Sequence, residues 1–165
     1  MPELKWLDGY TGQTLEQILA LEGEYRVDSL VLALEQALGQ KAARPDAQSL
    51  TKEERVVLAV EALQREVNNG GYGQFFSNSS RDFVPIIVES LRRIGCPQTA
   101  EITQKAIDVL CLPHLNAEEI AAMGEDSSKR SAELKSCDEL YCDTQEDIAG
   151  KLFAFIRINR GAIKL

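Results

Sequence analysis

Two adjacent glycines interrupt the longest helical pattern of this 165-residue chain, and they constrain its fold more than any other feature. Residues 51–67 have the apolar spacing of an amphipathic helix, with Val56, Val60, Leu63 and Val67 along one face. Gly70 and Gly71 follow, and glycine readily adopts the positive φ with which many helices end. The chain is therefore expected to end a helix here and to fold back on itself.

The residues around these glycines form a dense run of amides and aromatics, which we name the signature segment (residues 66–78). Its candidate residues are Glu66, Asn68, Asn69, Gly70, Gly71, Tyr72, Gln74, Phe75, Phe76 and Asn78. In a structural interpretation, the amides satisfy backbone groups in a turn and the aromatics fill the core. In a second interpretation, the segment is a small-molecule or peptide site, or an enzyme site, with Glu66 as acid or base. No nucleophile, partner base or metal-ligand set accompanies the run, which favours the structural interpretation and no catalytic residue.

Helical periodicity extends over most of the chain, and no period-two strand pattern appears. Capping boxes predict helix starts at Thr14 and Thr51, and residues 144–147 predict the start of the last helix. Further helices are expected over about 24–38, from 79–82 to Gly95, from Pro97 to Pro113, and over about 117–123 and 129–141, with a loop over 39–49. These patterns predict a single all-α domain over residues 1–165, with seven or eight helices.

The composition excludes several classes of protein. No apolar run approaches the ~18 residues of a membrane span, so no membrane association is expected. The N-terminal residues lack a secretory signal pattern, which indicates a cytoplasmic protein. Four cysteines without a CxxC pair, together with the single His114, do not make a structural zinc site. We therefore expect reduced, mostly buried thiols, no metal and no cofactor.

The net charge of −8 lies almost entirely in one segment. Ten acidic and three basic residues occupy positions 116–147, whereas residues 148–165 hold four basic residues and no acid. The candidate partner-binding acids are Glu118, Glu119, Glu125, Asp126, Glu133, Asp138, Glu139 and Asp143. They form either a solvated face that aids solubility, or rows that imitate the phosphates of a duplex. Direct binding of nucleic acid is disfavoured, because phosphate contacts require clustered lysine and arginine.

The signature segment also resembles a known pattern. Its sequence EVNNGGYGQFFSN resembles the signature E-V-N-N-G-G-aromatic-x-Q-aromatic-aromatic-x-N of a bacterial domain-of-unknown-function family, typified by the nineteen-kilodalton DNA-mimic protein of Neisseria. Residues 93–96, 100–106 and 138–141 are similar to later parts of the family, so the resemblance covers about Thr51 to Arg160. Ser80 and Arg81 stand where the family often places glycine.

The resemblance implies a non-enzymatic acidic protein that acts as a DNA mimic. Its partner would be a DNA-binding protein, such as a helix-turn-helix regulator, whose basic surface normally contacts duplex phosphates. A scaffold or dimerisation module, with the basic C-terminal helix against an acidic patch, is a third interpretation. The sequence thus leaves a homodimer open.

Overall fold

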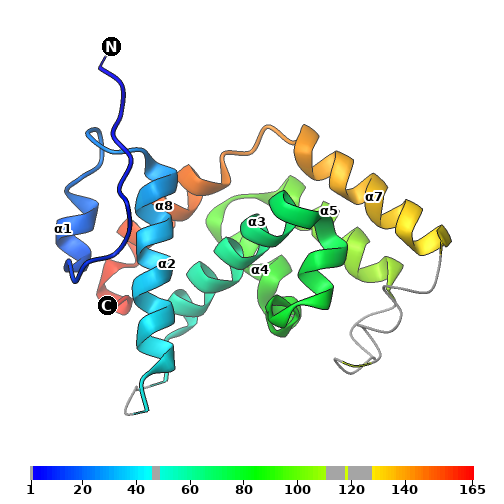
Figure 1. Ribbon diagram of the computed structural model, residues 1–165, viewed down its shortest axis with the longest axis horizontal. Coiled ribbons are helices and arrows are strands. Elements are labelled where there is room, and N and C mark those ends of the chain that lie inside the picture. The colour runs from blue at the N-terminus through cyan, green and yellow to red at the C-terminus, as the bar shows by residue number, and fades with distance from the viewer. Residues whose placement is uncertain (1, 46–48, 111–117, 119–127) are drawn as a thin grey trace. The chain divides into compact units, whose positions relative to one another are not determined.

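The chain is all-α, as predicted. The computed structural model describes residues 2–45, 49–110, 118 and 128–165 (Figure 1). Within these residues it contains seven α-helices and two 3₁₀ helices, and the only β-type pairing is isolated bridges at Tyr25. The elements are α1 (Leu15–Leu19), α2 (Val27–Ala43), α3 (Lys52–Ser77), η1 (Ser79–Phe83), α4 (Val84–Ile94), α5 (Pro97–Val109), α7 (Ser128–Asp143), α8 (Ile148–Ile158) and η2 (Arg160–Ala162).

Most helix ends lie where the local sequence predicts them. Thr14 accepts from Gln17 N while the Gln17 side chain accepts from Thr14 N, which is the predicted capping box of α1. Gly95 ends α4 in the left-handed region with φ 90°, and Pro97 opens α5. The predicted helix over 129–141 is α7. The predicted helix over 117–123 lies outside the described residues except for residue 118, as does Pro113.

The bounds of α2 differ from the prediction at both ends. Its start is delayed to Val27 because the preceding residues pair with the N-terminal segment: Lys5 N donates to Glu24 O and Arg26 N donates to Lys5 O. Its end passes Gly39 and reaches Ala43, so the predicted loop over 39–49 was wrong for residues 39–43. A single exposed glycine costs a helix only ~1 kcal/mol, and the contacts of Lys41 described below hold the last turn.

The two glycines interrupt α3 as expected, but the aromatic half of the signature segment is helical. Gly70 (φ −155°, ψ 16°) and Gly71 (φ 76°, ψ −176°) have non-helical backbone, and helical geometry resumes before Ser77. The signature segment is therefore two helical pieces joined by a two-residue break. The sequence predicted the break correctly and missed the second piece.

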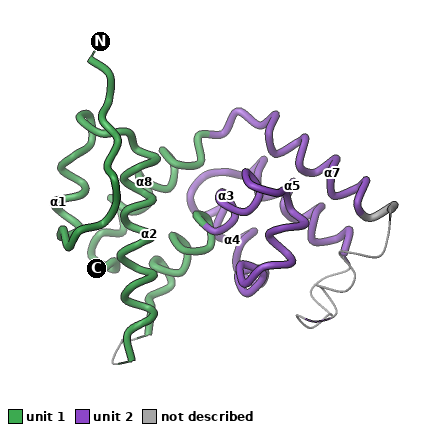
Figure 2. Tube along the Cα trace, in the orientation of Figure 1, with its two compact units in different colours: residues 1–61, 147–165 green, residues 62–146 purple. Residues whose placement is uncertain are grey.

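Contacts group the chain into two compact units (Figure 2). Unit 1 contains residues 1–61 and 147–165, and unit 2 contains residues 62–146, so α3 contributes residues to both. In unit 1, α2 packs against α8 and α1. In unit 2, α5 packs against α4 and α7. The expectation of one domain over residues 1–165 stays a prediction.

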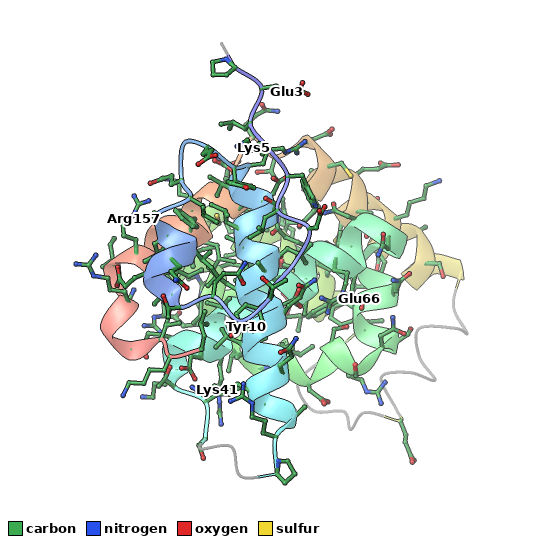
Figure 3. All side chains as sticks on the ribbon, turned by 60° about the vertical axis from the view of Figure 1, so that its left-hand side comes forward. Glu3, Lys5, Tyr10, Lys41, Glu66 and Arg157 are labelled. Atoms are coloured by element: carbon green, nitrogen blue, oxygen red, sulfur yellow. The ribbon has the colours of Figure 1, made fainter. Side chains whose placement is uncertain are left out.

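A buried carboxylate organises unit 1. The side chain of Glu54 is fully buried, and its Oε1 accepts from Lys41 Nζ (2.8 Å) and from Lys164 N (2.9 Å). Its Oε2 accepts from Thr51 N (3.1 Å), while Glu54 N donates to Thr51 Oγ1 (3.1 Å), which completes the predicted capping box. Lys41, which projects from α2 (Figure 3), also donates to Lys164 O, and Thr51 Oγ1 donates to Ala162 O. One carboxylate thus joins α2, α3 and the C-terminal segment.

Candidate functional site

The break in the signature segment is fixed by Gly71. Its φ of 76° with ψ of −176° is a conformation that residues other than glycine essentially never adopt. A Cβ on Gly71 would lie 2.7 Å from Cγ of Asp138, a residue of α7, and would overlap its carboxylate. Both the backbone angles and the close approach of α7 therefore require glycine at this position.

Glu66 joins the two sides of the break. Its Oε2 accepts from Gln74 Nε2 (2.7 Å) and from Asn78 Nδ2 (2.8 Å), and its Oε1 lies 3.8 Å from Arg65 Nε. A Cβ on Gly70 would lie 2.9 Å from Cδ of Gln74, so this glycine leaves room for the side chain that reaches Glu66. These contacts use three of the predicted polar residues to hold the helical pieces together.

The aromatic residues of the signature segment lie in the core of unit 2. Tyr72, Phe75 and Phe76 are buried. The Tyr72 ring stacks on Phe76 at 6.2 Å between centroids and meets Tyr141 of α7 edge-on at 6.0 Å. Its hydroxyl shares a 2.8 Å hydrogen bond with Thr103 of α5, and burial raises the pKa of Tyr72 far above its ordinary value. Tyr72 therefore ties the signature segment to both α5 and α7.

Two predicted residues have no such contacts. Asn68 and Asn69 are exposed on α3, just before the break. Within the described part of the chain, no side-chain hydrogen bond is found for either amide. The structure thus brings together Glu66, Gln74 and Asn78 through their side chains and leaves the Asn68–Asn69 pair at the surface.

Asp138 connects the acidic segment to the signature segment. Its Oδ1 accepts a 2.7 Å hydrogen bond from Tyr72 N, the first backbone amide after the break. Burial raises the pKa of the Asp138 carboxyl, the Tyr72 hydrogen bond opposes this, and the charge of Glu139 adds to it, so that the pKa lies above its ordinary value. Asp138 is half-buried, whereas the other described acids of that group, Glu118, Glu133, Glu139 and Asp143, are exposed.

The other acids of α7 face outward. Leu134, Cys137 and Tyr141 form the buried stripe of this helix, with Asp138 at its border. Exposed carboxylates on the remaining face belong to Glu133, Glu139 and Asp143, and Leu140 is also 44% exposed. Glu118 is exposed as well. Of the other predicted acids, Glu119, Glu125 and Asp126 lie outside the described residues.

Two acids after α7 are helix caps, which the sequence interpretation missed in part. Glu146 Oε1 accepts from Gln98 N (2.9 Å), and its Oε2 accepts from Thr99 N (2.8 Å) and Thr99 Oγ1 (2.7 Å). It thereby caps α5, whose N-cap residue Cys96 does not cap the helix with its own side chain. Asp147 caps α8 by accepting from Gly150 N. Both carboxylates therefore have a structural role as helix caps.

The charge imbalance follows the division into units. Unit 2 has 14 acidic and 8 basic residues in its sequence, whereas unit 1 has 12 and 10. Unit 2 therefore carries most of the negative charge, and it also contains the signature segment.

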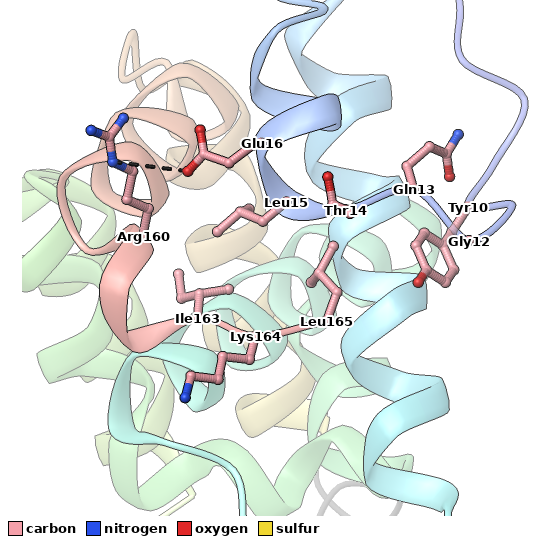
Figure 4. A pocket seen from close by; sticks show the side chains of 10 residues that line it. All are labelled: Tyr10, Gly12, Gln13, Thr14, Leu15, Glu16, Arg160, Ile163, Lys164 and Leu165. Carbon is pink, nitrogen blue, oxygen red and sulfur yellow. Dashed lines mark ion pairs between the residues drawn. The ribbon is translucent and has the colours of Figure 1, made fainter.

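A pocket of about 380 Å³ lies in unit 1, at a distance in sequence from the signature segment (Figure 4). It is lined by residues 10 and 12–16 and by residues 160 and 163–165. Arg160 Nε and Glu16 Oε1 lie 3.9 Å apart on its wall, and both side chains are largely exposed. None of the predicted signature or partner-binding residues lines this pocket.

The described residues show no candidate metal site and no membrane-spanning helix. They contain no group of three His, Cys, Asp or Glu side chains placed to hold a metal ion. None of the described helices is long and apolar enough to cross a membrane. Cys96 and Cys137 are buried and Cys142 is exposed, and none of the three is in a disulfide, while Cys111 and His114 lie outside the described residues.

Comparison with protein families identifies a family for this chain. Residues 48–159 match the model of a family described as DMP19-like protein, which is more than half of the chain and includes the signature segment. Comparisons with curated proteins and with solved structures gave no match.

Proposed function

Because the chain belongs to the DMP19-like protein family, we propose that it is a non-enzymatic DNA mimic that occupies the DNA-binding surface of a transcriptional regulator. The observation that carries the proposal is the set of exposed carboxylates on α7, Glu133, Glu139 and Asp143, in a unit with an excess of acids. A helix-turn-helix dimer is the kind of partner that such a surface fits, because its basic residues normally contact phosphates.

The spacing of Glu139 and Asp143 along α7 supports mimicry. At 1.5 Å per residue, Glu139 and Asp143 are ~6 Å apart along the helix axis, and Glu133 and Asp143 are ~15 Å apart. One strand of B-DNA carries a phosphate every ~3.4 Å along its axis, so two intervals span ~7 Å, whereas ~15 Å falls between four intervals (~14 Å) and five intervals (~17 Å). The rise from Glu139 to Asp143 is therefore comparable to two phosphate intervals of a duplex strand, whereas Glu133 adds negative charge without that match.

The other interpretations receive less support. The Glu66 carboxylate is engaged by Gln74 and Asn78, and Tyr72, Phe75 and Phe76 fill the core. These contacts favour a structural role for the signature segment over a ligand or enzyme site. The exposed Leu140 beside the acids favours a protein partner, which can offer apolar as well as basic contacts. A homodimer stays a prediction that sedimentation would test.

The proposal is tested by affinity capture from a bacterial lysate at low salt, with elution by duplex DNA and identification of the eluted proteins. The regulator recovered is then purified and its affinity for the chain is measured at several salt concentrations. We expect the chain and a duplex containing the regulator's site to compete, and the affinity to fall steeply with salt. Elution of no DNA-binding protein by the duplex, from a folded bait, would contradict the proposal.

Charge reversals locate the surface. Glu133→Lys, Glu139→Lys and Asp143→Lys should each weaken regulator binding by about tenfold, which corresponds to ~1.4 kcal/mol. Glu3→Lys in unit 1 and Glu89→Lys on α4 are matched controls, because both positions are exposed and both changes alter the net charge equally. Equal losses in the controls would show that net charge, and not the α7 face, governs binding.

A further inference from the structure

The contact between Asp138 and Tyr72 joins α7 to the helix break of the signature segment. The 2.7 Å hydrogen bond from Tyr72 N satisfies the first backbone amide after the helix break. The carboxylate lies so close to Gly71 that a side chain on residue 71 would overlap it. Tyr72 and Asp138 are 66 residues apart in sequence, so this contact is a long-range one.

Further contacts lie at the C-terminal end of α7 and just after it. The Tyr141 ring meets Tyr72 edge-on, one turn after Asp138. Beyond the end of the helix, Glu146 caps α5 through both of its oxygens. In the middle of α7, Asp138 supplies the contact with the break itself. The exposed carboxylates Glu133, Glu139 and Asp143 are on the same helix and therefore move with it.

We infer that Asp138 is a positioning residue: it holds α7 on the break of the signature segment, so that the exposed carboxylates of α7 keep one fixed arrangement toward the partner. This inference rests on the proposed function and names a different role for Asp138 from that of its exposed neighbours. It also gives the signature segment a purpose in binding without placing it in the interface.

Fixed placement of α7 matters because a mimic competes with a duplex whose charges are already arranged. A surface that has to order its helix on binding loses affinity by the free energy of that ordering. A carboxylate that accepts from a buried backbone amide and fills the space over Gly71 can hold the helix through its shape and its acceptor oxygen. Its charge is not needed for that role.

The test separates charge from acceptor at this one position. Asp138→Asn removes the charge and keeps an acceptor for Tyr72 N, whereas Asp138→Ala removes both. Glu139→Gln is the matched control, because it removes one charge from an exposed neighbour on the same helix. For each variant, amide hydrogen exchange is measured by NMR at Tyr72 and along α7, and affinity is measured for the regulator recovered by duplex elution.

With a positioning role, Asp138→Ala should accelerate exchange at Tyr72 and in α7 by about tenfold or more and weaken regulator binding by a similar factor. Asp138→Asn should keep the exchange rates at Tyr72 and in α7 at those of the unmodified chain, and its affinity within about twofold. Glu139→Gln should weaken regulator binding and leave the exchange rates unchanged. Rescue by asparagine is the result that a direct charge contact would not give.

Two results would overturn the inference. Loss of affinity in Asp138→Asn equal to that in Glu139→Gln would make Asp138 a direct contact of the partner. Unchanged exchange at Tyr72 and along α7 in Asp138→Ala would show that the contact holds nothing in place. If duplex elution recovers no regulator, the exchange data alone decide the placement of α7, so a failure of the proposed function is distinguishable from a failure of the positioning role.

Discussion

In each unit of this molecule, one carboxylate joins elements that are far apart in sequence. The pKa values of these two carboxylates are shifted in opposite directions. In unit 1, burial raises the pKa of Glu54, but the hydrogen bonds from Lys41, Lys164 N and Thr51 N outweigh it, so that the pKa is lowered. In unit 2, Asp138 accepts from Tyr72 N, no described cation pairs with it, and its pKa is raised. The folded chain therefore favours the ionised form of Glu54 and disfavours the ionised form of Asp138.

The comparison separates two uses of acidic residues in one chain. A buried carboxylate with a cation and several donors is an electrostatic anchor, and removal of one partner leaves the others unsatisfied. A half-buried carboxylate with a single amide donor is mainly an acceptor of the right shape. We expect the two sites to respond differently to amide substitution and to pH.

The largest effect is expected at Glu54. Glu54→Gln places an NH₂ group where one of two accepting oxygens stood, so it faces either Lys41 or Thr51 N as a second donor. The half-buried Lys41 also loses its counter-charge. The free energy of unfolding at neutral pH should fall by about 3 kcal/mol or more, as measured by urea denaturation.

The control for Glu54 is the exposed Glu16. Its pair with Arg160 is largely exposed at 3.9 Å, so Glu16→Gln should change stability by less than about 0.5 kcal/mol. If Glu54→Gln lowered the free energy of unfolding no more than Glu16→Gln does, the stability of unit 1 would not depend on Glu54.

The next largest effect is expected at the break of the signature segment. Gly71→Ala adds a Cβ in a conformation restricted to glycine and against the Asp138 carboxylate, so stability should fall by about 2–3 kcal/mol. Gly73→Ala is the matched control, because a Cβ there meets no atom within 4 Å, and it should be neutral or stabilising. Thermal denaturation of the two variants measures both changes in stability. Equal changes in Gly71→Ala and Gly73→Ala would contradict the requirement for glycine at position 71.

Much of the fold could be predicted from sequence, because its signals are local. The capping boxes at Thr14 and Thr51, the left-handed Gly95 and the apolar stripe of α3 act within one or two helical turns. The start of α2 was missed because it depends on pairing with Lys5, far away in sequence. The continuation past Gly39 was missed because the anchor of Lys41 is a residue of α3.

The candidate site was less predictable, because sequence gives charge without direction. Asp138, Glu139 and Glu146 look alike in a list of acids, yet they are a long-range acceptor, a surface charge and a cap of another helix. One signal could have separated Asp138. The buried stripe of Leu134, Cys137 and Tyr141 puts it beside the apolar face, whereas Glu139 falls opposite. Apart from the glycines before Tyr72, nothing in the sequence indicated that the Tyr72 backbone amide would donate to Asp138.

The smallest effect is expected from pH at Asp138, and its sign distinguishes the two carboxylates. A carboxyl whose folded pKa is raised contributes stability that is present below its unfolded pKa of about 3.9 and is lost as pH rises through the folded value. Glu54, with a lowered pKa, behaves oppositely: its contribution is present above its unfolded pKa and is lost as pH falls through the folded value.

Asp138→Asn should therefore match the unmodified chain in stability at low pH and become relatively more stable as pH rises from the unfolded pKa to the raised folded pKa of Asp138, with a constant difference above that value. The comparison of the two chains at each pH cancels the contribution of Glu54, which both retain. Glu139→Gln should narrow the pH range over which the difference develops, because the charge of Glu139 is one cause of the raised pKa. Urea denaturation at a series of pH values gives the curve. A difference that shrinks as pH rises would mean that Asp138 is stabilised by its charge, as Glu54 is, and the contrast between the two units would not hold.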